Sequence, residues 1–399
     1  MKVDISKWEL KTLGDVCTFK RGLTYPKTEE SAVITSNVVL RSNNIDLNTC
    51  ALVFNELKYL SDLYNIPNER KLVKDSILMC MSNGSSAHIG KVAYIDKDYD
   101  YAFGGFMGLI IPNNINPKFL YYKYRSESFK TFLGKIGNGI NITNLKFSSI
   151  SPLPIYVPTL AEQEVIVREL NALQEMIDGY KAHISDFDEL AKSLFLDTLG
   201  DPVINEKKWQ IKSLSSLCNK MSTGPFGSML HKSDYVVEGI PSVNPQNIKG
   251  SKVVIDGIAK VSYQKAEELS KYYLKENDII LARRGDLSKC AIITPKEQGW
   301  LCGTGSFFLH IEEVLPIVFY YQFTSKSIQK QLLEKSIGAT MPNLNQGILS
   351  KLMIPVPPID IQQKFASQIV AIEKQKAILC EQLADAEQLM AERMQYYFS

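Results

Sequence analysis

Residues 160–199 have the sequence LAEQEVIVRELNALQEMIDGYKAHISDFDELAKSLFLDTL, in which apolar residues recur in alternating steps of four and three. Steps of this kind place one narrow apolar line along a helix, which is the heptad pattern of helices that pair with another helix. The apolar line, which we call the seam, contains Ile166, Leu170, Leu173, Ile177, Tyr180 and Ile184. The stretch therefore predicts a long helix that needs a helical partner.

The same pattern returns 199 residues later, at residues 357–399. Its seam contains Phe365, Ile369, Ile372, Leu379, Leu383 and Met390, and it is interrupted by Lys376 and Arg393. Because a seam this narrow is not buried on a lone helix, we expect the two helices to pair with each other. The alternative is that each is an ordinary amphipathic helix packed on its own domain. The two cations either extend to the edge of the seam or mark where the pairing loosens.

The segments outside the helices are also two copies of one sequence pattern. Residues 8–17 and 209–218 share Trp, Lys, Leu and Cys at the same places, and residues 75–78 match 278–281. A repeat of this length indicates a duplicated domain. The sequence thus predicts an α+β protein with two globular mixed α/β domains, residues 1–157 and 201–356. Two long coiled-coil helices, 158–200 and 357–399, separate them.

Charge is divided between these segments. The two domains each carry a formal charge of +5, whereas residues 158–200 carry −6 and residues 357–399 carry −2. A polyanion such as DNA would therefore be attracted to the domains, which leaves the helices for protein partners. The alternative is that this modest basic charge has no such role.

Motifs of catalysis and metal binding are missing from the sequence. It has no Gly-rich loop for a nucleotide or methyl donor, and no Asn/Asp-Pro-Pro-aromatic motif of an amino-methyltransferase. The four histidines and seven cysteines have no metal-ligand spacing. No apolar run is long enough to cross a membrane, and no signal-peptide pattern begins the sequence. We therefore expect a non-catalytic protein of the cytoplasm, without a metal, a cofactor or a membrane partner.

Candidate DNA-binding residues gather in the loops of the two domains. Arg283 and Arg284 follow an apolar strand, and paired guanidinium groups there can bind guanine edges or phosphates. The other candidates are short polar side chains and lysines of the same loops, although each also fits ordinary turn chemistry. The complete set is Ser82, Asn83, Lys91, Asn138, Asn141, Thr143, Asn144, Arg283, Arg284, Lys289, Asn343 and Asn345.

These features together resemble the specificity subunit of type I restriction-modification systems, over essentially the whole chain. The matching motifs are Trp-x-x-Lys-x-Leu at Trp8 and Trp209, the Ala-Arg-Arg-Gly turn at 282–285, the proline-punctuated strands, and the Glu/Gln-rich helix starts. The first domain departs from the pattern, because Met-Ser-Asn-Gly at 81–84 replaces the Arg-Arg-Gly turn. No base-contact role is therefore transferred from the family to that turn.

The resemblance implies two target recognition domains that each bind one half of a bipartite site in double-stranded DNA. It also implies that the two long coiled-coil helices pair antiparallel, with pseudo-twofold symmetry, and hold two methyltransferase subunits. Restriction or translocase subunits would be attached through those methyltransferase subunits. Adenine methylation would belong to those partners, which would use S-adenosylmethionine. A helix of about 38 residues is roughly 57 Å long, which corresponds to about 17 base pairs. The alternatives are the DNA-recognition subunit of another restriction system and a symmetric protein–protein adaptor that does not bind DNA.

Overall fold

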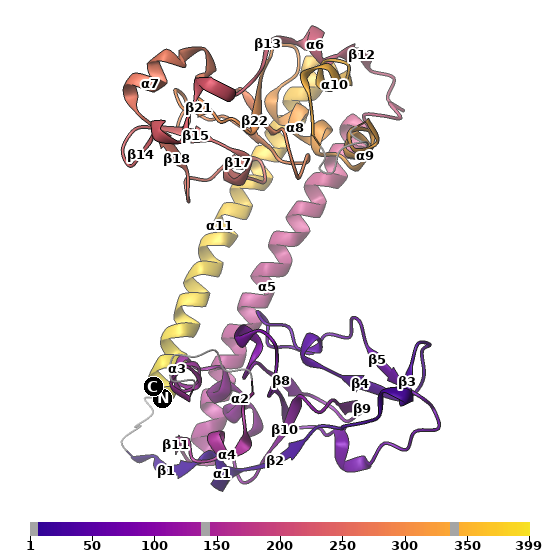
Figure 1. The fold of residues 1–399 in the computed structure, drawn as a ribbon, viewed down its shortest axis with the longest axis vertical. Helices are drawn as coiled ribbons and strands as arrows, with labels where there is room; N and C mark the ends of the chain where they lie inside the picture. Colours follow the sequence, from indigo (N-terminus) through magenta and orange to yellow (C-terminus); the bar gives the residue numbers. More distant parts are fainter. Residues whose placement is uncertain (1–6, 137–143, 336–342) are drawn as a thin grey trace. The chain divides into compact units, whose positions relative to one another are not determined.

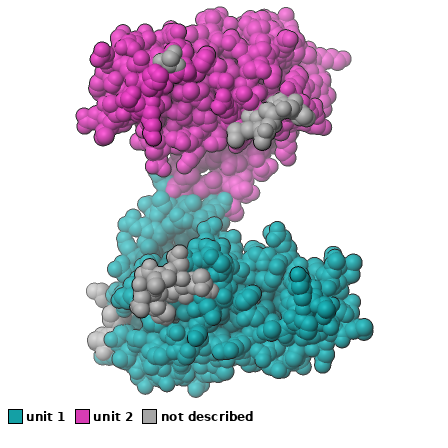
Figure 2. Space-filling model, in the orientation of Figure 1, with its two compact units in different colours: residues 1–181, 381–399 teal, residues 182–380 magenta. Residues whose placement is uncertain are grey.

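The computed structural model describes residues 7–136, 144–335 and 343–399, apart from the side chain of residue 228. It divides into two compact units, which Figure 2 distinguishes. Unit 1 contains residues 1–181 and 381–399, and unit 2 contains residues 182–380. Both long helices, α5 (Leu160–Leu199) and α11 (Ile359–Phe398), contribute one half to each unit. Each unit therefore combines one globular domain with two helix halves.

The described residues of unit 1 form three sheets and four shorter α-helices. Its strands are β1 (Glu9–Thr12), β2 (Cys17–Arg21), β3 (Glu30–Ser31), β4 (Val38–Leu40), β5 (Lys58–Leu60), β6 (Lys71–Leu72), β7 (Ser76–Cys80), β8 (Val92–Ile95), β9 (Tyr99–Phe103), β10 (Met107–Pro112) and β11 (Pro154–Val157). Its shorter helices are α1 (Leu13–Val16), α2 (Pro117–Arg125), α3 (Glu127–Ile136) and α4 (Phe147–Ile150). The sheet orders are β1-β11, β2-β10-β7-β8 and β3-β5-β4-β9-β6. In Figure 1, β3, β4, β5 and β9 lie on the side of the unit away from α5.

Unit 2 repeats this arrangement. Its strands are β12 (Gln210–Ser213), β13 (Cys218–Thr223), β14 (Tyr235–Val236), β15 (Ile240–Val243), β16 (Ile248–Lys249), β17 (Lys252–Val253), β18 (Ala259–Val261), β19 (Ile279–Ala282), β20 (Cys290–Ile292), β21 (Leu301–Cys302), β22 (Ser306–Ile311) and β23 (Met353–Val356). Its helices are α6 (Leu214–Leu217), α7 (Tyr263–Glu268), α8 (Pro316–Thr324), α9 (Lys326–Lys335) and α10 (Gln346–Ser350). The order β13-β22-β19-β20 matches β2-β10-β7-β8, and β12-β23 matches β1-β11.

The four-stranded sheet lies between two cores in each unit. In unit 1, Ile77 and Met79 of β7 belong to the core that includes α2 and α5, whereas Leu78 and Cys80 belong to the core on the other face. Successive side chains of a strand point to opposite faces, so a strand buried on both faces is apolar throughout. This explains the continuous apolar run of β7, and β19 of unit 2 is buried in the same way.

Within each unit the two helix halves run antiparallel. In unit 1, Glu169 of α5 binds Arg393 of α11 and Lys181 binds Glu387, so the numbers rise on one helix and fall on the other. In unit 2, Asp188 binds Lys376, and the ring of Phe195 lies 6.2 Å from that of Phe365. The fold class predicted from the sequence, with two repeated mixed α/β domains and two long helices, is confirmed.

The seams contact the globular domains as well as each other. Phe365 packs 5.3 Å from the ring of Tyr321 on α8, and Tyr122 on α2 donates a hydrogen bond of 2.9 Å to Asn171 on α5. Both packing arrangements considered from the sequence therefore occur. The buried seam residues are Ile166, Leu170, Leu173, Ile177, Phe365, Ile369, Ile372 and Met390, and the half-buried ones are Tyr180, Ile184, Leu379 and Leu383.

The two cations that interrupt the second seam make ion pairs to the other helix. Arg393 binds Glu169 through two nitrogens, and the hydroxyl of Tyr397 donates a 2.7 Å hydrogen bond to the same carboxylate. These bonds lower the pKa of Glu169, with the Arg393 bond as the largest cause. Lys376 makes an ion pair with Asp188 on the other helix through its ammonium nitrogen. The interruptions thus specify which residues of the helices face each other.

One correspondence taken from the sequence is wrong by one residue. The N–H groups of Asp75 and Asn277 each donate 2.8 Å bonds, to Ile95 and Ile293 respectively, and these two residues have φ values of 60° and 69°. Asp75 is therefore equivalent to Asn277, not to Asp278. Both Asp and Asn tolerate the left-handed region, so the identity of the residue did not reveal the alignment.

Candidate nucleic-acid interface

The ends of the four-stranded sheet carry the same local arrangement in both units, which we call the recognition platform. In unit 1 it consists of residues 81–83, 104–106 and 144. In unit 2 it consists of residues 283–285, 303–305 and 343, together with Phe226, which lines the same hollow as the first two of these segments. Backbone bonds join the three segments, because Ser82 bridges Asn144 and Arg284 bridges Asn343.

Two backbone bonds of each platform have a counterpart in the other unit. The N–H of Met81 donates to the backbone oxygen of Phe106 at 2.9 Å. In unit 2, the N–H of Arg283 donates to the backbone oxygen of Gly305, also at 2.9 Å. The N–H of Leu145 donates to Met81 at 2.7 Å, and that of Leu344 donates to Arg283 at 2.9 Å. A common backbone therefore presents different side chains in the two units, which is the usual arrangement of recognition loops on a rigid scaffold.

The platform of unit 2 lines a hollow of about 470 Å³. Its lining residues are Phe226, Gly227, Arg283, Arg284, Thr304 and Gly305. Arg283 is half-buried and Arg284 is exposed. Gly285 ends the turn with a φ of 78°, a conformation that glycine adopts at little cost. Two guanidinium groups beside a hydroxyl and a phenyl ring can bind both the polar edges and the methyl groups of bases.

The platform of unit 1 carries small polar groups instead. Ser82 and Asn83 are half-buried and Asn144 is exposed. The amide of Asn83 donates a 2.8 Å bond to the hydroxyl of Ser42, and its oxygen accepts a 2.9 Å bond from the N–H of Ser85. These bonds fix the orientation of Asn83. The structure thus brings three of the predicted residues of this domain together.

Lys91 has a different role from the DNA contact predicted for it. Its side chain is buried, and its ammonium group donates a 2.7 Å bond to the backbone oxygen of Ile45. Burial lowers the pKa of this lysine. Lys289 is its counterpart in unit 2, since it donates a 2.9 Å bond to Pro245, although it is only half-buried. Each lysine thus binds the loop that follows one strand of its unit, β4 in unit 1 and β15 in unit 2. The burial of Lys91 argues against a contact with DNA.

The remaining predicted residues either lie directly before α10 or fall outside the described residues. Asn343 and Asn345 are exposed, and Asn345 begins α10 by accepting a 2.9 Å bond from the N–H of Ile348. A capping role of this kind is sufficient to explain an asparagine. Asn138, Asn141 and Thr143 lie outside the described residues.

Two aromatic residues of the platforms were missed by the sequence prediction. Phe106 is 71% exposed and Phe226 is 54% exposed. Neither falls in a pattern that marks a recognition residue, since each lies in a short loop between strands. Only the pairing of distant segments places them beside the predicted polar residues.

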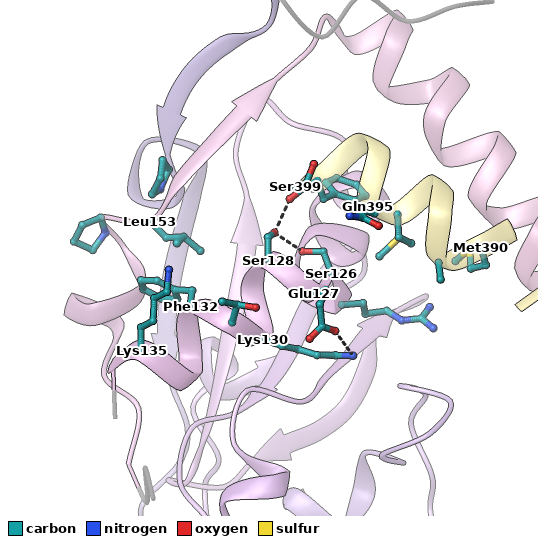
Figure 3. Close-up of a pocket in the computed structure, with 17 residues that line it drawn as sticks. Ser126, Glu127, Ser128, Lys130, Phe132, Lys135, Leu153, Met390, Gln395 and Ser399 are labelled. Carbon is teal, nitrogen blue, oxygen red and sulfur yellow. Dashed lines mark hydrogen bonds and ion pairs between the residues drawn. The ribbon is translucent and has the colours of Figure 1, made fainter. Parts of the chain in front are cut away.

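A larger groove lies in unit 1 at the last turns of α11 (Figure 3). It has a volume of about 930 Å³, with Phe132, Leu153, Met390, Met394 and Phe398 among its apolar lining residues. Its charged residues are Arg125, Glu127, Lys130 and Lys135, and Glu127 binds Lys130 at 3.4 Å. Figure 3 shows this ion pair at the edge of the groove. The groove therefore combines an apolar floor with a net positive rim.

The end of α11 beside this groove is fixed by a buried lysine. Lys123 donates a 3.1 Å bond to the backbone oxygen of Phe398, and the hydroxyl of Ser128 donates to the same oxygen at 2.5 Å. A cation at this position complements the negative end of the helix dipole. Burial lowers the pKa of Lys123 to about 8.

Unit 2 has a groove at the equivalent place. It has a volume of about 820 Å³ and is lined by the end of α5, by the junction of α8 and α9, and by the turn at residues 249–252. The residues of that junction, 324–327, correspond to residues 125–128 of the first groove. The position of the grooves is thus a property of the repeated domain.

Two groups of features now define the class of the protein: a duplicated α+β domain with a platform of polar and aromatic loops, and helices shared between the copies. The family model described as "Type I restriction modification DNA specificity domain" matches residues 5–185 and 206–388. The chain belongs to this family and contains two copies of its domain. The prediction of a type I specificity subunit is confirmed at the level of the family.

Known proteins that resemble the chain agree with this assignment. It is 23% identical over 383 residues to the type I restriction enzyme StySPI specificity subunit of Salmonella potsdam, covering 91% of this chain and 81% of that protein. The fold resembles that of the type I restriction-modification S subunit of M. genitalium, with a TM-score of 0.58, 16% identity, and coverage of 100% of this chain and 98% of that one.

A second solved structure, described as "Structural basis underlying complex assembly and conformational transition of the type I R-M system", gives a TM-score of 0.60 at 16% identity. The match covers 98% of this chain and 97% of that one. Over the described residues, no helix has the length and apolar character needed to span a bilayer. The same residues contain no cluster of three or more His, Cys, Asp or Glu side chains arranged for a metal ion.

Proposed function

We propose that this chain recognises a bipartite sequence in double-stranded DNA, with one half-site bound by each recognition platform. The observation that carries the proposal is the repetition of the platform, with matching backbone bonds and different side chains in the two units. A repeated backbone gives each domain the same way of approaching the duplex. The different side chains, Arg283 and Arg284 against Met81 and Ser82, then give each half-site its own base preference.

The chemistry on DNA belongs to partner subunits in this proposal. Two methyltransferase subunits bind the long helices, methylate adenine with S-adenosylmethionine, and connect the chain to restriction or translocase subunits. This chain supplies recognition and holds no cofactor. The acidic charge of the helices, −6 for residues 158–200, disfavours binding of DNA there and supports their use as protein-binding elements.

The groove of Figure 3 is our candidate for one contact with a methyltransferase subunit. Its apolar floor suits the apolar face of a helix, and the net positive rim suits acidic residues beside that face. We expect the double variant Lys130→Glu, Lys135→Glu to bind the methyltransferase subunit about tenfold more weakly, measured by calorimetric titration. A variant with the same change of charge on another surface, Lys232→Glu with Lys260→Glu, is the control. Equal affinities of the two variants would contradict this contact.

Sequence recognition is tested by methylation-sensitive sequencing of the host genome, which we expect to show a two-part motif with an unspecified spacer. Exchanging residues 201–356 for those of a relative should alter only one half of that motif. A change in both halves would show that the domains are not independent.

Two alternatives give different outcomes. A protein–protein adaptor would show no sequence preference and no salt-dependent DNA affinity in a gel-shift titration with the methyltransferase present. A recognition subunit of another restriction system would be revealed by the neighbouring genes, because nuclease and methyltransferase would then share one chain.

A further inference from the structure

Each recognition platform exposes one phenyl ring. Phe106 is 71% exposed in unit 1, and Phe226 is 54% exposed in unit 2. A scattered exposed apolar residue needs no explanation by itself. These two rings, however, lie beside the residues predicted to bind DNA.

The two rings come from different positions of the repeat. Phe106 precedes β10, at the place that Gly305 occupies in unit 2, because the backbone oxygens of both residues accept the equivalent bonds. Phe226 follows β13, in the loop that corresponds to the one after β2. Duplication of a single phenylalanine therefore does not explain why both platforms carry one. What the two residues share is exposure beside the predicted DNA-binding turn of their unit, not a position in the repeat.

The backbone holds Phe106 in a fixed place. Its oxygen accepts bonds from the N–H groups of Met81 at 2.9 Å and Ser82 at 3.1 Å. A Cβ atom on the preceding Gly105 would lie 3.0 Å from the hydroxyl of Thr24, so this loop packs closely against the next one. The exposed ring thus stands on a backbone that is bonded to the predicted DNA-binding turn.

The backbone before Phe226 is also closely packed. A Cβ atom on Gly224 would lie 2.0 Å from the backbone oxygen of Gly303, which no larger residue could accommodate without movement of the backbone. The ring of Phe226 lines the same hollow as Arg283, Arg284 and Thr304. A phenyl ring and two guanidinium groups therefore face one space of about 470 Å³.

We propose that Phe106 and Phe226 determine base specificity through apolar contact with the 5-methyl group of thymine, one ring in each half-site. This inference rests on the proposed function. Guanidinium groups recognise guanine from the major groove, and thymine presents its methyl group in the same groove. The ring of Phe226, beside the Arg283–Arg284 turn, is thus positioned for that methyl group. The ring of Phe106 has the same relation to the equivalent turn of unit 1. Leaving a phenyl ring in water sacrifices favourable burial, which contact with the base restores.

The test replaces the methyl group and the ring in turn. The probes are duplexes with the motif found by methylation-sensitive sequencing, in which each thymine of a half-site is changed to deoxyuracil. Binding is measured by gel-shift titration with the complete methyltransferase complex. For the unchanged protein, we expect one deoxyuracil in each half-site to weaken binding about fourfold, the effect of one methyl group.

The variants Phe226→Ala and Phe106→Ala should each remove the effect of deoxyuracil in one half-site and leave the other unchanged. Val237→Ala and Leu63→Ala are the controls, since these side chains are 90% and 95% exposed in units 2 and 1 but lie outside the platforms. They should keep both effects. The inference is overturned if deoxyuracil weakens binding equally for the alanine variants and the unchanged protein, or if no thymine methyl group contributes. If the unchanged protein bound duplexes of different sequence equally well, the proposed function itself would be refuted.

Discussion

Individual side chains of the platforms have roles that their residue type alone does not reveal. Arg284 and Lys91 are both cations in loops of a basic domain, and both were predicted to bind DNA. The structure exposes Arg284 and buries Lys91 against the backbone oxygen of Ile45. The location of the charge, rather than its presence, therefore separates a binding residue from a residue that stabilises the fold.

This difference predicts opposite effects of two substitutions. Arg284→Ala should weaken DNA binding and reduce the slope of log affinity against log salt by about 1 if the residue binds phosphate, or relax one base preference if it binds guanine. Lys91→Met should change neither, because the ammonium group of Lys91 is buried against the backbone oxygen of Ile45. It should instead lower the free energy of unfolding by about 1–3 kcal/mol, since the oxygen of Ile45 loses its partner. Salt-dependent titration and thermal unfolding separate the two outcomes; a changed salt slope for Lys91→Met would contradict its assignment.

The ion pair of Glu169 and Arg393 gives a second prediction for single residues. The pKa of Glu169 is lowered by the bonds from Arg393, so the pair stabilises unit 1 when the carboxyl group is ionised. That contribution is present above the ordinary pKa of glutamate and is lost as the pH falls through the lowered value. A double-mutant cycle with Glu169→Gln and Arg393→Met should give a coupling energy of about 1 kcal/mol at neutral pH. It should approach zero in acid.

The pair of Lys181 and Glu387 is a matched control for this cycle. It also joins the two helices in unit 1, at 2.7 Å, but its side chains are about half exposed. A single nitrogen–oxygen contact in water is weak, so its coupling should be smaller than that of the two-nitrogen contact of Arg393. Equal coupling of the two pairs would show that the geometry at Arg393 adds nothing.

Residue roles were the least predictable part of the site. The position of the Arg283–Arg284 turn at the end of β19 could be predicted because the pair directly follows an apolar strand, whereas its role in DNA binding stays a prediction. Phe106 and Phe226 could not be found, since no local pattern separates an exposed phenylalanine of a loop from a core residue. Their significance depends on strand pairing between segments far apart in the sequence.

The elements were more predictable, because repetition and periodicity act over many residues. The long helices and their matched seams agree with the structure. The sheets β3-β5-β4-β9-β6 and β14-β18-β15-β21 could not be predicted, since their strands are as short as two residues, as in β3 and β14. Such strands have too few residues to show a period of two, and they are held by tertiary pairing.

A buried glutamine fixes the start of each long helix to its domain. In unit 1, the side chain of Gln163 accepts a 2.7 Å bond from the N–H of Asn116 and donates one of 2.8 Å to Pro158. Gln362 makes the equivalent bonds in unit 2, to Leu315 and Pro357, each of 2.8 Å. Asn116 and Leu315 precede α2 and α8, so each glutamine joins the first turn of a long helix to the start of a shorter one.

Replacement of either glutamine by leucine should destabilise only its own unit. The loss leaves a backbone N–H and a backbone oxygen unpaired in the core, at a cost of about 1–3 kcal/mol. For a unit of this size, we expect the unfolding temperature to fall by roughly 2–4 °C for each kcal/mol. Differential scanning calorimetry of Gln163→Leu and Gln362→Leu measures this effect, with the exposed neighbour Glu164→Leu as the control. No change relative to Glu164→Leu would show that the bonds contribute little.

The molecule as a whole is a duplication in which each long helix is shared by both units. The helix halves of unit 1 come from residues 160–181 and 381–398, and those of unit 2 from residues 182–199 and 359–380. Neither domain therefore has a complete helical partner within its own half of the sequence. A chain cut between the repeats must re-form these pairs with another copy, so the duplication joins two recognition units into one molecule.

We propose that the length of the long helices sets the spacer between the two half-sites. An insertion of four residues near Ala182 in α5, matched by four after Cys380 in α11, should lengthen the preferred spacer. Four residues add about 6 Å to a helix, which corresponds to about one or two base pairs. The position is suitable because the neighbouring seam residues Tyr180 and Ile184 are only half-buried. Binding to duplexes of graded spacer length measures the shift.

The control for this experiment is the same insertion at Gly250, in the turn between β16 and β17. A Cβ atom on Gly250 would meet no atom within 4 Å, so the turn has room for added residues. This variant should keep the original spacer because it leaves both helices unchanged. If the helix insertion also kept the original spacer while the protein still bound both half-sites, the helices would not determine the distance. The spacing would then have to arise from the partner subunits or from bending of the DNA.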